Sequence, residues 1–572
     1  MSRQEAEFHK IFEELMLEAA GDGDEAVTAA RKAGALAFGR DADRAFEAFS
    51  RASDLKPLDA APRIALARLL AAKGDLDGAR MRAQAAFDIA FDEADRGFAA
   101  FALGEIAEAG GDLKEARAQF EMARKLAETV CANDPHDAAV AHDLAAARQR
   151  LAEFDLRQGE AARAEEGHKA ALAILNQLAE RQRGAPAILA DRAFSLARLA
   201  DLALNAGNET RAIRHADDAE RAYALLADQS TKSDPDLNAA RAQLAALRAE
   251  IARRNGAFGE ARREMERALT LRNKQVAADP SQRGALALTW RRHADMLSES
   301  GEVHLAEAAR GQARTLAEAL YKEQPQDDIA GRNLLDVLLH NGAAELAEGA
   351  LEPARRTLAD AVHLADARLA ASPKDSRRMS ELAAAWDRLA DVAITAKKPQ
   401  AALDALARAL ELAHMTADSN PGATGPIRNL AAIALKYGAL HSENGNHQSA
   451  RAILDMAFKL RLQLAEAAGE TPNSLLSLAV ALERLGLAAQ ADRDPAAARA
   501  AWEDELSLAG RIWKEPTAEG LRFCAIVRTH LASLSGADAK DHRAAALDAL
   551  DQIESVGKQT PEDARLRASL QR

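Results

Sequence analysis

Carboxylate side chains recur along the sequence at a nearly constant spacing, and a row of this kind could bind a cationic partner. Its members are Glu105, Glu153, Asp201, Glu250, Asp295 and, after a gap, Asp391. The first five follow one another at intervals of 45 to 49 residues. Along one wall, these carboxylates would attract a basic segment through many weak contacts that salt screens.

The same carboxylates permit a second interpretation, in which their charge is already neutralised. Four arginines each stand three residues before a member of the row: Arg150, Arg198, Arg292 and Arg388. On a helix this spacing forms surface ion pairs worth about 0.2–0.5 kcal/mol each. The sequence therefore leaves open whether the row binds a partner or is a solvated ladder of ion pairs.

Patterns that carry catalysis or hold a cofactor are absent from the sequence. It contains no G-x-x-x-x-G-K-[ST] phosphate loop, no H-E-x-x-H, no paired C-x-x-C and no G-x-S-x-G nucleophile elbow. His168, His293 and His441 stand singly and are interpreted as structural. Gly-Asp-Gly-Asp at 21–24 lacks the rest of a calcium loop and predicts a turn that caps a helix. We expect no catalytic residue, no metal site and no cofactor.

The composition favours helices and disfavours some partners. Of the 572 residues, 48% are hydrophobic but only 4% are aromatic, which favours helices over sheets. The net charge of −13 repels phosphate backbones and anionic lipid, so we expect neither a nucleic acid nor a membrane partner. Only two cysteines, Cys131 and Cys524, and an N-terminus without an apolar leader segment indicate a cytoplasmic protein.

A turn residue recurs through the chain and sets a period. The ten turn residues are Gly74, Gly111, Gly159, Gly207, Gly256, Gly301, Gly349, Lys397, Gly445 and Arg493. Their intervals are 37, 48, 48, 49, 45, 48, 48, 48 and 48 residues. A period of this size indicates a solenoid of repeated units.

Small residues recur at three positions around each turn residue. Seven residues before it, all ten units have Ala or Gly, and five residues after it all ten have Ala. Twelve residues after it, nine units have Ala and only Glu505 breaks the series. Two helices joined by a tight turn approach closely only where both present small side chains. These positions therefore predict the contact line of a helical hairpin.

This pattern of small residues around a turn resembles the tetratricopeptide repeat, a 34-residue pair of antiparallel helices. The resemblance covers roughly residues 25–515 and implies an all-α fold, a right-handed α-solenoid of antiparallel helix pairs. The usual interval here is 48 residues. The 14 additional residues would lengthen each helix by about two turns and keep its buried face in register.

Prolines and the loss of the pattern predict the boundaries. Four pairs predict an N-cap followed by proline at the first helical position: Asp134-Pro135, Asp234-Pro235, Asp279-Pro280 and Asn420-Pro421. We expect four segments: an N-terminal amphipathic helix (1–24), short repeats (25–133), long repeats of about 48 residues (134–515) and a helical C-terminal cap (516–572).

The resemblance also implies where a partner binds. In the family, the first helix of each unit lines the concave face, and the residue after the small position points into the groove. Carried over, this places the row from Glu105 to Asp391 on the inner wall. Phe98, Phe101 and Phe194 occupy other concave positions, where they anchor a partner or pack between units.

The first residues of the chain predict an amphipathic helix. Within 4–18, one face carries Phe8, Ile11, Phe12 and Leu15. This helix either caps the first repeat or docks onto a partner, including a second copy of the chain.

The sequence thus predicts a non-enzymatic scaffold that binds a protein partner. If the acidic row is the binding site, the partner should bind through a basic segment. The alternatives are a regulatory sensor whose groove binds a small peptide or ligand, and an enzyme with an unrecognised site. Similar long repeats are often joined to bacterial kinase or caspase-like domains, which suggests signalling by association only.

Overall fold

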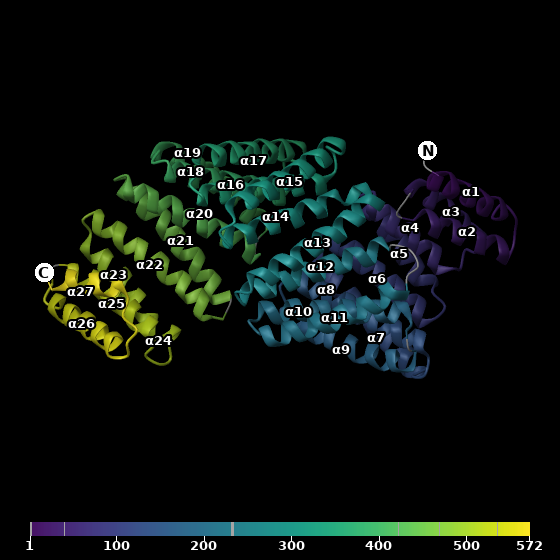
Figure 1. The fold of residues 1–572 in the computed structure, drawn as a ribbon, viewed down its shortest axis with the longest axis horizontal. Coiled ribbons are helices and arrows are strands. Elements are labelled where there is room, and N and C mark those ends of the chain that lie inside the picture. Colours follow the sequence, from purple (N-terminus) through teal and green to yellow (C-terminus); the bar gives the residue numbers. More distant parts are fainter. Residues whose placement is uncertain are drawn as a thin grey trace. The chain divides into compact units, whose positions relative to one another are not determined.

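The chain folds into helices joined by short turns and divides into two compact units (Figure 1). The computed structural model describes residues 3–38, 41–182, 184–229, 234–420, 423–467, 469–534 and 536–571. Within these ranges every regular element is helical, so the predicted all-α fold is confirmed. The first unit is Met1–Gln282 and the second is Arg283–Arg572, and each is described by itself.

The helices follow one another with little intervening chain. Those of the first unit are α1 (Arg3–Glu18), α2 (Asp24–Ala37), α3 (Ala42–Leu55), α4 (Ala60–Ala72), α5 (Leu76–Ile89), α6 (Glu93–Ala109), α7 (Leu113–Asn133), α8 (Ala138–Arg157), α9 (Ala161–Arg181), α10 (Pro186–Asn205), α11 (Glu209–Gln229), α12 (Pro235–Arg254), α13 (Phe258–Ala278) and the 3₁₀ helix η1 (Pro280–Gln282). Those of the second unit are α14 (Arg283–Glu299), α15 (Val303–Glu323), α16 (Asp328–Ala347), α17 (Leu351–Ala371), α18 (Ser376–Thr395), α19 (Pro399–Ser419), α20 (Thr424–Glu443), α21 (His447–Ala467), α22 (Pro472–Ala491), α23 (Pro495–Ser507), α24 (Ala509–Ile512), α25 (Ala518–Ser533), α26 (Ala539–Ser555) and α27 (Pro561–Leu570).

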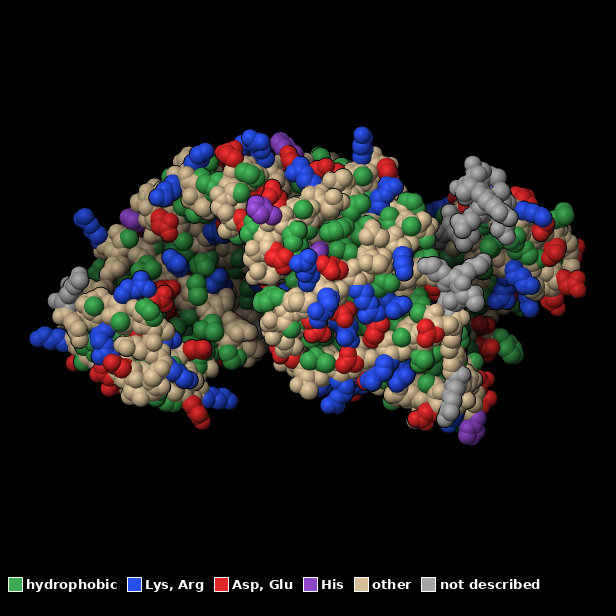
Figure 2. All heavy atoms as spheres, in the orientation of Figure 1, with side chains coloured by type: hydrophobic (Ala, Val, Ile, Leu, Met, Phe, Trp, Pro, Cys, Tyr) green, Lys and Arg blue, Asp and Glu red, His purple; other side chains and the backbone are tan. Residues whose placement is uncertain are grey.

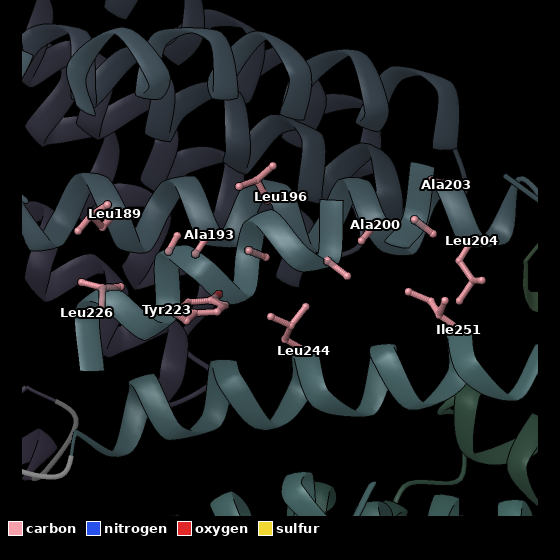
Figure 3. Close-up of a cluster of buried hydrophobic side chains, with 14 residues drawn as sticks. Leu189, Ala193, Leu196, Ala200, Ala203, Leu204, Tyr223, Leu226, Leu244 and Ile251 are labelled. Atoms are coloured by element: carbon pink, nitrogen blue, oxygen red, sulfur yellow. The ribbon is translucent and has the colours of Figure 1, made fainter. Parts of the chain in front are cut away.

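Consecutive helices pack as antiparallel pairs, and neighbouring pairs share a core. In the first unit, α6 packs on α7, α8 on α9, α10 on α11 and α12 on α13. The first helices of neighbouring pairs also touch, as α8 and α10 do. Figure 3 shows one such core, in which Leu196, Tyr223 and Leu244 come from three successive helices, α10, α11 and α12. Because such a core spans two pairs, these pairs bury their apolar faces against each other.

The predicted turn residues adopt the backbone conformation that the turn requires. All ten have positive φ, from 54° at Lys397 to 85° at Gly74. In this conformation a helix end satisfies its last carbonyls, as where the Asp112 N–H donates to the Ala107 carbonyl at 2.9 Å. Eight of the ten residues are glycine because a Cβ is disfavoured at positive φ, and Lys397 and Arg493 are the exceptions.

Replacing Lys397 with glycine should therefore raise the stability of the second unit by about 0.5–1 kcal/mol. The expected gain in free energy is the backbone strain relieved at φ 54°, minus the stabilisation that the unfolded chain gains from the greater conformational entropy of glycine. The midpoint of urea unfolding measures it. Gly349→Ala, at φ 81°, is the matched reverse change and should lower the midpoint. A lower midpoint for Lys397→Gly would contradict the explanation.

The small positions form the contact line of each pair, as predicted. The ten residues seven before each turn are all Ala or Gly, and those at 67, 200, 249, 294 and 390 have no exposed surface. Where this residue is glycine, a large side chain nine residues after the turn fills the space. The four pairs are Gly104 with Phe120, Gly342 with Leu358, Gly438 with Leu454 and Gly486 with Trp502. The missing side chain of the glycine on the first helix thus makes room for a large side chain on the second helix.

Helix lengths divide the chain into short and long pairs. Helices α2 to α5 have 13 or 14 residues. Most later first helices have 20, and the second helices from α7 to α21 have 21. The difference is about two turns, as expected. However, α7 lies within the predicted short segment (25–133) and already has the greater length.

The predicted proline caps are correct at two of the three pairs that can be compared. Asp234 caps α12, with Pro235 at its start. Asp279 ends α13 and also caps η1, because its carboxylate accepts from the Ser281 N–H at 3.0 Å and Pro280 is the first residue of η1. Asp134 instead ends α7. Elsewhere the N-cap is the aspartate two residues after the proline, because the proline first forms a turn; these caps are Asp137, Asp327 and Asp375. Pro421, of the pair Asn420-Pro421, lies outside the described residues.

The repeat changes near the C-terminus. Helix α23 has 13 residues and is followed by the short α24, and α25 and α26 then pack as a further pair. Among the described residues, one helix, Pro472–Ala491 (α22), is long and apolar enough to cross a membrane by length and composition, with a mean hydropathy of 1.2. Its Leu475, Leu478 and Leu482 pack with Leu508 and Ile512 in a buried cluster, as a core helix of a hairpin does.

Candidate binding groove

Glu105 and Glu153, two carboxylates of the acidic row in the first unit, lie beside cations. Glu105 pairs with Arg68 at 2.8 Å. Glu153 lies 2.8 Å from Arg198 and 3.2 Å from the ring of the fully buried His168. Burial by itself raises the pKa of Glu153, but hydrogen bonds and charge from His168 and Arg198 outweigh it and hold the pKa below its usual value. Glu153 therefore stays ionised inside its own ion-pair cluster.

The other members of the row are paired in different ways. Glu250 binds Arg253 at 2.7 Å and Arg254 at 2.9 Å, and the Arg253 hydrogen bond is the main cause of its lowered pKa. In the second unit, Asp295 lies 3.5 Å from Arg291 and Asp391 lies 2.7 Å from Lys436. Asp201 differs from these members, because its carboxylate accepts a weak hydrogen bond from the amide of Asn205 at 3.3 Å.

The ion pairs do not follow the spacing of three residues that the sequence suggested. Arg198 pairs with Glu153 of the preceding unit, although Asp201 is three residues after it. Lys436 pairs with Asp391 in the same way. Each cation stands nine residues before its turn and each acid six before the preceding turn. At these two acids the pair forms between units, because first helices of neighbouring units lie side by side. Glu250 and Asp295 instead pair along their own helices.

Two arginines occupy this cation position in units whose preceding unit has no acid to pair with them. Arg388 and Arg484 hold the cation position, but the preceding units have Ala343 and Ala439 at the acid position. Over the part of the chain that the structure describes, neither arginine is in an ion pair. Figure 2 shows the broader outcome, since positive and negative side chains are interspersed on the visible face rather than separated.

The three candidate phenylalanines differ in their surroundings. Phe101 packs on Phe120 with ring centroids 5.1 Å apart, and the guanidinium groups of Arg68 and Arg150 lie 5.8 and 4.5 Å from its centre. Phe194 packs against His168. Phe98 is 49% exposed and is the one of the three most accessible to a partner.

Phe98 and Phe101 line a groove of about 240 Å³ in the first unit, which we call the N-terminal groove. Helices α4, α6, α7 and α8 contribute to it. Small and apolar residues form most of its lining: Ala94, Gly97, Ala123, Ala127, Val130, Val140, Ala146 and Ala147. Four charged residues complete it: Arg68, Glu93, Asp143 and Arg150. Phe194 is not among the lining residues.

Sequence reasoning found Phe98 and Phe101 but did not assign Glu93, Asp143 or Arg150 to the groove. Arg150 was interpreted as a neutralising partner of Glu153, whereas it lies over the ring of Phe101. The signal was present in the repeats. The position nine residues before the turn is basic in most long units: Arg150, Arg198, Arg292, Arg388, Lys436 and Arg484.

The apolar face of α1 is covered within the first unit. Phe12, which is 3% exposed, packs with Ala33, Ala45 and Phe49 of α2 and α3, and Phe8 and Leu15 lie at the edge of this cluster. Ile11 is the exposed member of the predicted face. The helix thus caps the first hairpin, and a docking role for it stays a prediction.

No metal cluster is found within the described residues, where no group of three His, Cys, Asp or Glu side chains is placed to hold an ion. Gly23, in the Gly-Asp-Gly-Asp segment, has positive φ and stands at the N-cap of α2, which agrees with the predicted turn. Cys131 and Cys524 are both free.

No protein-family model and no curated protein sequence matches the chain. Among solved structures, yeast Tom70 superposes with a TM-score of 0.39 at 13% identity, covering 93% of this chain and 99% of that one. BtubC from P. vanneervenii gives 0.38 at 19%, covering 46% and 94%. The human IFIT1 dimer with m7Gppp-AAAA gives 0.35 at 15%, covering 79% and 90%. These TM-scores are below 0.5, so the fold assignment rests on the chain's own helix pairs.

The paired helices, positive-φ turns and shared cores define the class of each unit as an α-solenoid of helical hairpins.

Proposed function

We propose that this chain is a non-enzymatic interaction scaffold built of lengthened tetratricopeptide-type units of about 48 residues. Its first unit binds a segment of a protein partner in the N-terminal groove. The observation that carries the proposal is the half-exposed Phe98 beside an apolar groove of about 240 Å³. An accessible aromatic side chain at a concave apolar surface is typical of a protein-binding anchor.

The shape of the groove supports a partner segment rather than a folded surface. Typical small-molecule pockets hold about 300–1,000 Å³, so this groove has room for a few side chains. An extended segment could place these side chains between α6 and α8 while most of its chain stays outside.

The acidic row stays a separate hypothesis under this proposal. A basic segment that binds Glu153 or Asp391 must displace Arg198 or Lys436 from an existing ion pair. Asp201 lacks such a competitor, since Leu247 occupies the cation position of the next unit. We keep the cytoplasm as the proposed compartment, which two free cysteines support.

Photo-crosslinking at Phe98 tests the proposal. A photoreactive phenylalanine analogue at this position should form adducts with one or a few defined proteins in native extracts, because the side chain would lie against the bound segment. The same analogue at Phe258, which is also half-exposed but lies outside the groove, is the matched control. Adduct formation is measured by mass spectrometry. Equal adducts at both positions, or none at Phe98, would refute binding at the groove.

A further inference from the structure

The N-terminal groove is charged differently at its two ends. We infer that it binds an extended segment in which a large apolar residue stands between a basic residue and an acidic residue. This inference rests on the proposed function and names the chemistry of the partner. The groove lining presents Arg150 toward one end and Glu93 with Asp143 toward the other, with Phe98 and the alanine-rich floor between them.

The positions along the helices can be compared because α4, α6 and α8 are in register. Arg68 and Glu105 each stand six residues before a turn, and they form an ion pair. Arg157 and Glu108 stand two and three residues before their turns, and they pair at 2.7 Å. A residue's distance from its turn therefore measures its position along the groove.

The cationic end lies toward the turns. Arg150 stands nine residues before Gly159. In the pairing between neighbouring units its partner would be Glu105, but Arg68 already holds that carboxylate at 2.8 Å. Within the described part of the chain Arg150 forms no ion pair, and the ring of Phe101 supports its guanidinium at 4.5 Å. A guanidinium held on an aromatic face keeps its N–H groups for a carboxylate.

The acidic end lies farther from the turns. Glu93 stands 18 residues before Gly111, and Asp143 stands 16 before Gly159. Over the described ranges, neither carboxylate is in an ion pair. At the groove edge, two carboxylates without an internal cation favour a lysine or arginine of the ligand.

The separation of the two ends sets the spacing in the ligand. Asp143 and Arg150 are seven residues apart on α8, which corresponds to about 10 Å along the helix axis. A chain in the polyproline II conformation advances about 3.1 Å per residue and repeats its side-chain direction every three residues, so charges three residues apart match this distance and face the same side. The two residues between them supply the apolar side chain that contacts Phe98. A uniformly acidic or uniformly basic segment would meet repulsion at one end.

Peptide titration of the full-length chain tests the inference. Four fluorescein-labelled peptides share a Leu-Phe centre and Gly-Ser flanks, and they differ only in the two outer residues. These are Lys and Glu, Lys and Lys, Glu and Glu, or Gln and Gln. Fluorescence anisotropy at low salt should give the mixed peptide an affinity about five- to tenfold above each of the others, and the advantage should shrink as salt increases.

Charge reversal in the protein gives a readout that general destabilisation would not produce. Arg150→Glu should shift the preference to the Lys and Lys peptide, and Asp143→Lys should shift it to the Glu and Glu peptide. Arg484→Glu is the matched control, because this arginine holds the equivalent position in a unit outside the groove. Circular dichroism verifies that all three variants are folded.

The possible failures separate the two proposals. If all four peptides bind equally, or Arg150→Glu weakens them all alike, the charge inference is wrong and the groove can still bind a protein. If no peptide binds but Phe98 still crosslinks to a protein, the inference is also wrong and the scaffold proposal stands. If Phe98 yields no adduct and no peptide binds, both are overturned.

Discussion

Replacing Glu505 with glutamine is expected to abolish most of the loss of stability that the second unit shows as the pH rises from about 4.5 to about 8. Glu505 stands twelve residues after the turn residue Arg493, at the position where the other nine units have Ala, and it is only 4% exposed. Its Oε2 has no hydrogen-bond partner among the described residues. Burial, with a smaller contribution from Glu483, raises its pKa to about 8.

The sign follows from proton binding. From about pH 4.5 to pH 8 the folded chain keeps a proton on Glu505 that the unfolded chain releases, so stability falls as the pH rises through this window. The loss amounts to at most about 5 kcal/mol above pH 8. Glutamine is neutral at every pH and of similar shape, so the variant should be more stable than the wild type above pH 8.

Urea unfolding followed by tryptophan fluorescence at several pH values measures this effect. Trp502 is a local reporter, because it is fully buried one turn from Glu505 on α23. His530 stacks against Trp502 with ring centroids 5.0 Å apart, and burial lowers its pKa, so its own contribution to stability rises with pH below about pH 6.5, opposite in sign to that of Glu505. Asp504→Asn, an exposed change on the same helix, is the control. Parallel pH profiles for the wild type and Glu505→Gln would contradict the explanation.

Replacing Gly342 with alanine is expected to cost about 1–3 kcal/mol in the second unit. A Cβ at this position would lie 2.7 Å from Cδ2 of Leu358, which has no exposed surface. Leu358 cannot move without disturbing the packing of α16 on α17. Thermal unfolding of the purified chain measures the loss.

Two further variants separate overpacking from helix propensity. Gly311→Ala changes a glycine inside α15 whose Cβ would meet no atom within 4 Å, and it should stabilise by up to about 1 kcal/mol. The double variant Gly342→Ala with Leu358→Ala reproduces the Ala67 and Ala83 pair of the first unit. If overpacking is the cause, the alanine at 342 should cost little in that background. An equal cost in both backgrounds would show that the clash is not the cause.

For the binding groove, the sequence predicted two aromatic residues but not the arrangement of charge. Phe98 and Phe101 followed from their positions in the repeat. Arg150 was assigned to Glu153 because a helix places residues three apart on one face. In the folded unit Arg198 pairs with Glu153 and Arg68 pairs with Glu105. Arg150 is therefore left to line the groove.

The sequence by itself determined the hairpins, because their requirements are local and repeat. A turn needs positive φ, which favours glycine, and the close approach of two helices needs Ala or Gly. Glycine located eight of the turns, the constant period located Lys397 and Arg493, and Ala or Gly located the contact lines of all ten units.

Only the tertiary structure decided which charges pair, which stay free and where a carboxyl is buried. These properties depend on side chains from helices about 45 residues apart, as in the pair of Arg198 and Glu153. A shift of one helix by a single turn would change every such pair while leaving the repeat pattern intact. The long-range packing of neighbouring first helices therefore set the charge of the N-terminal groove, and packing around α23 set the pKa of Glu505.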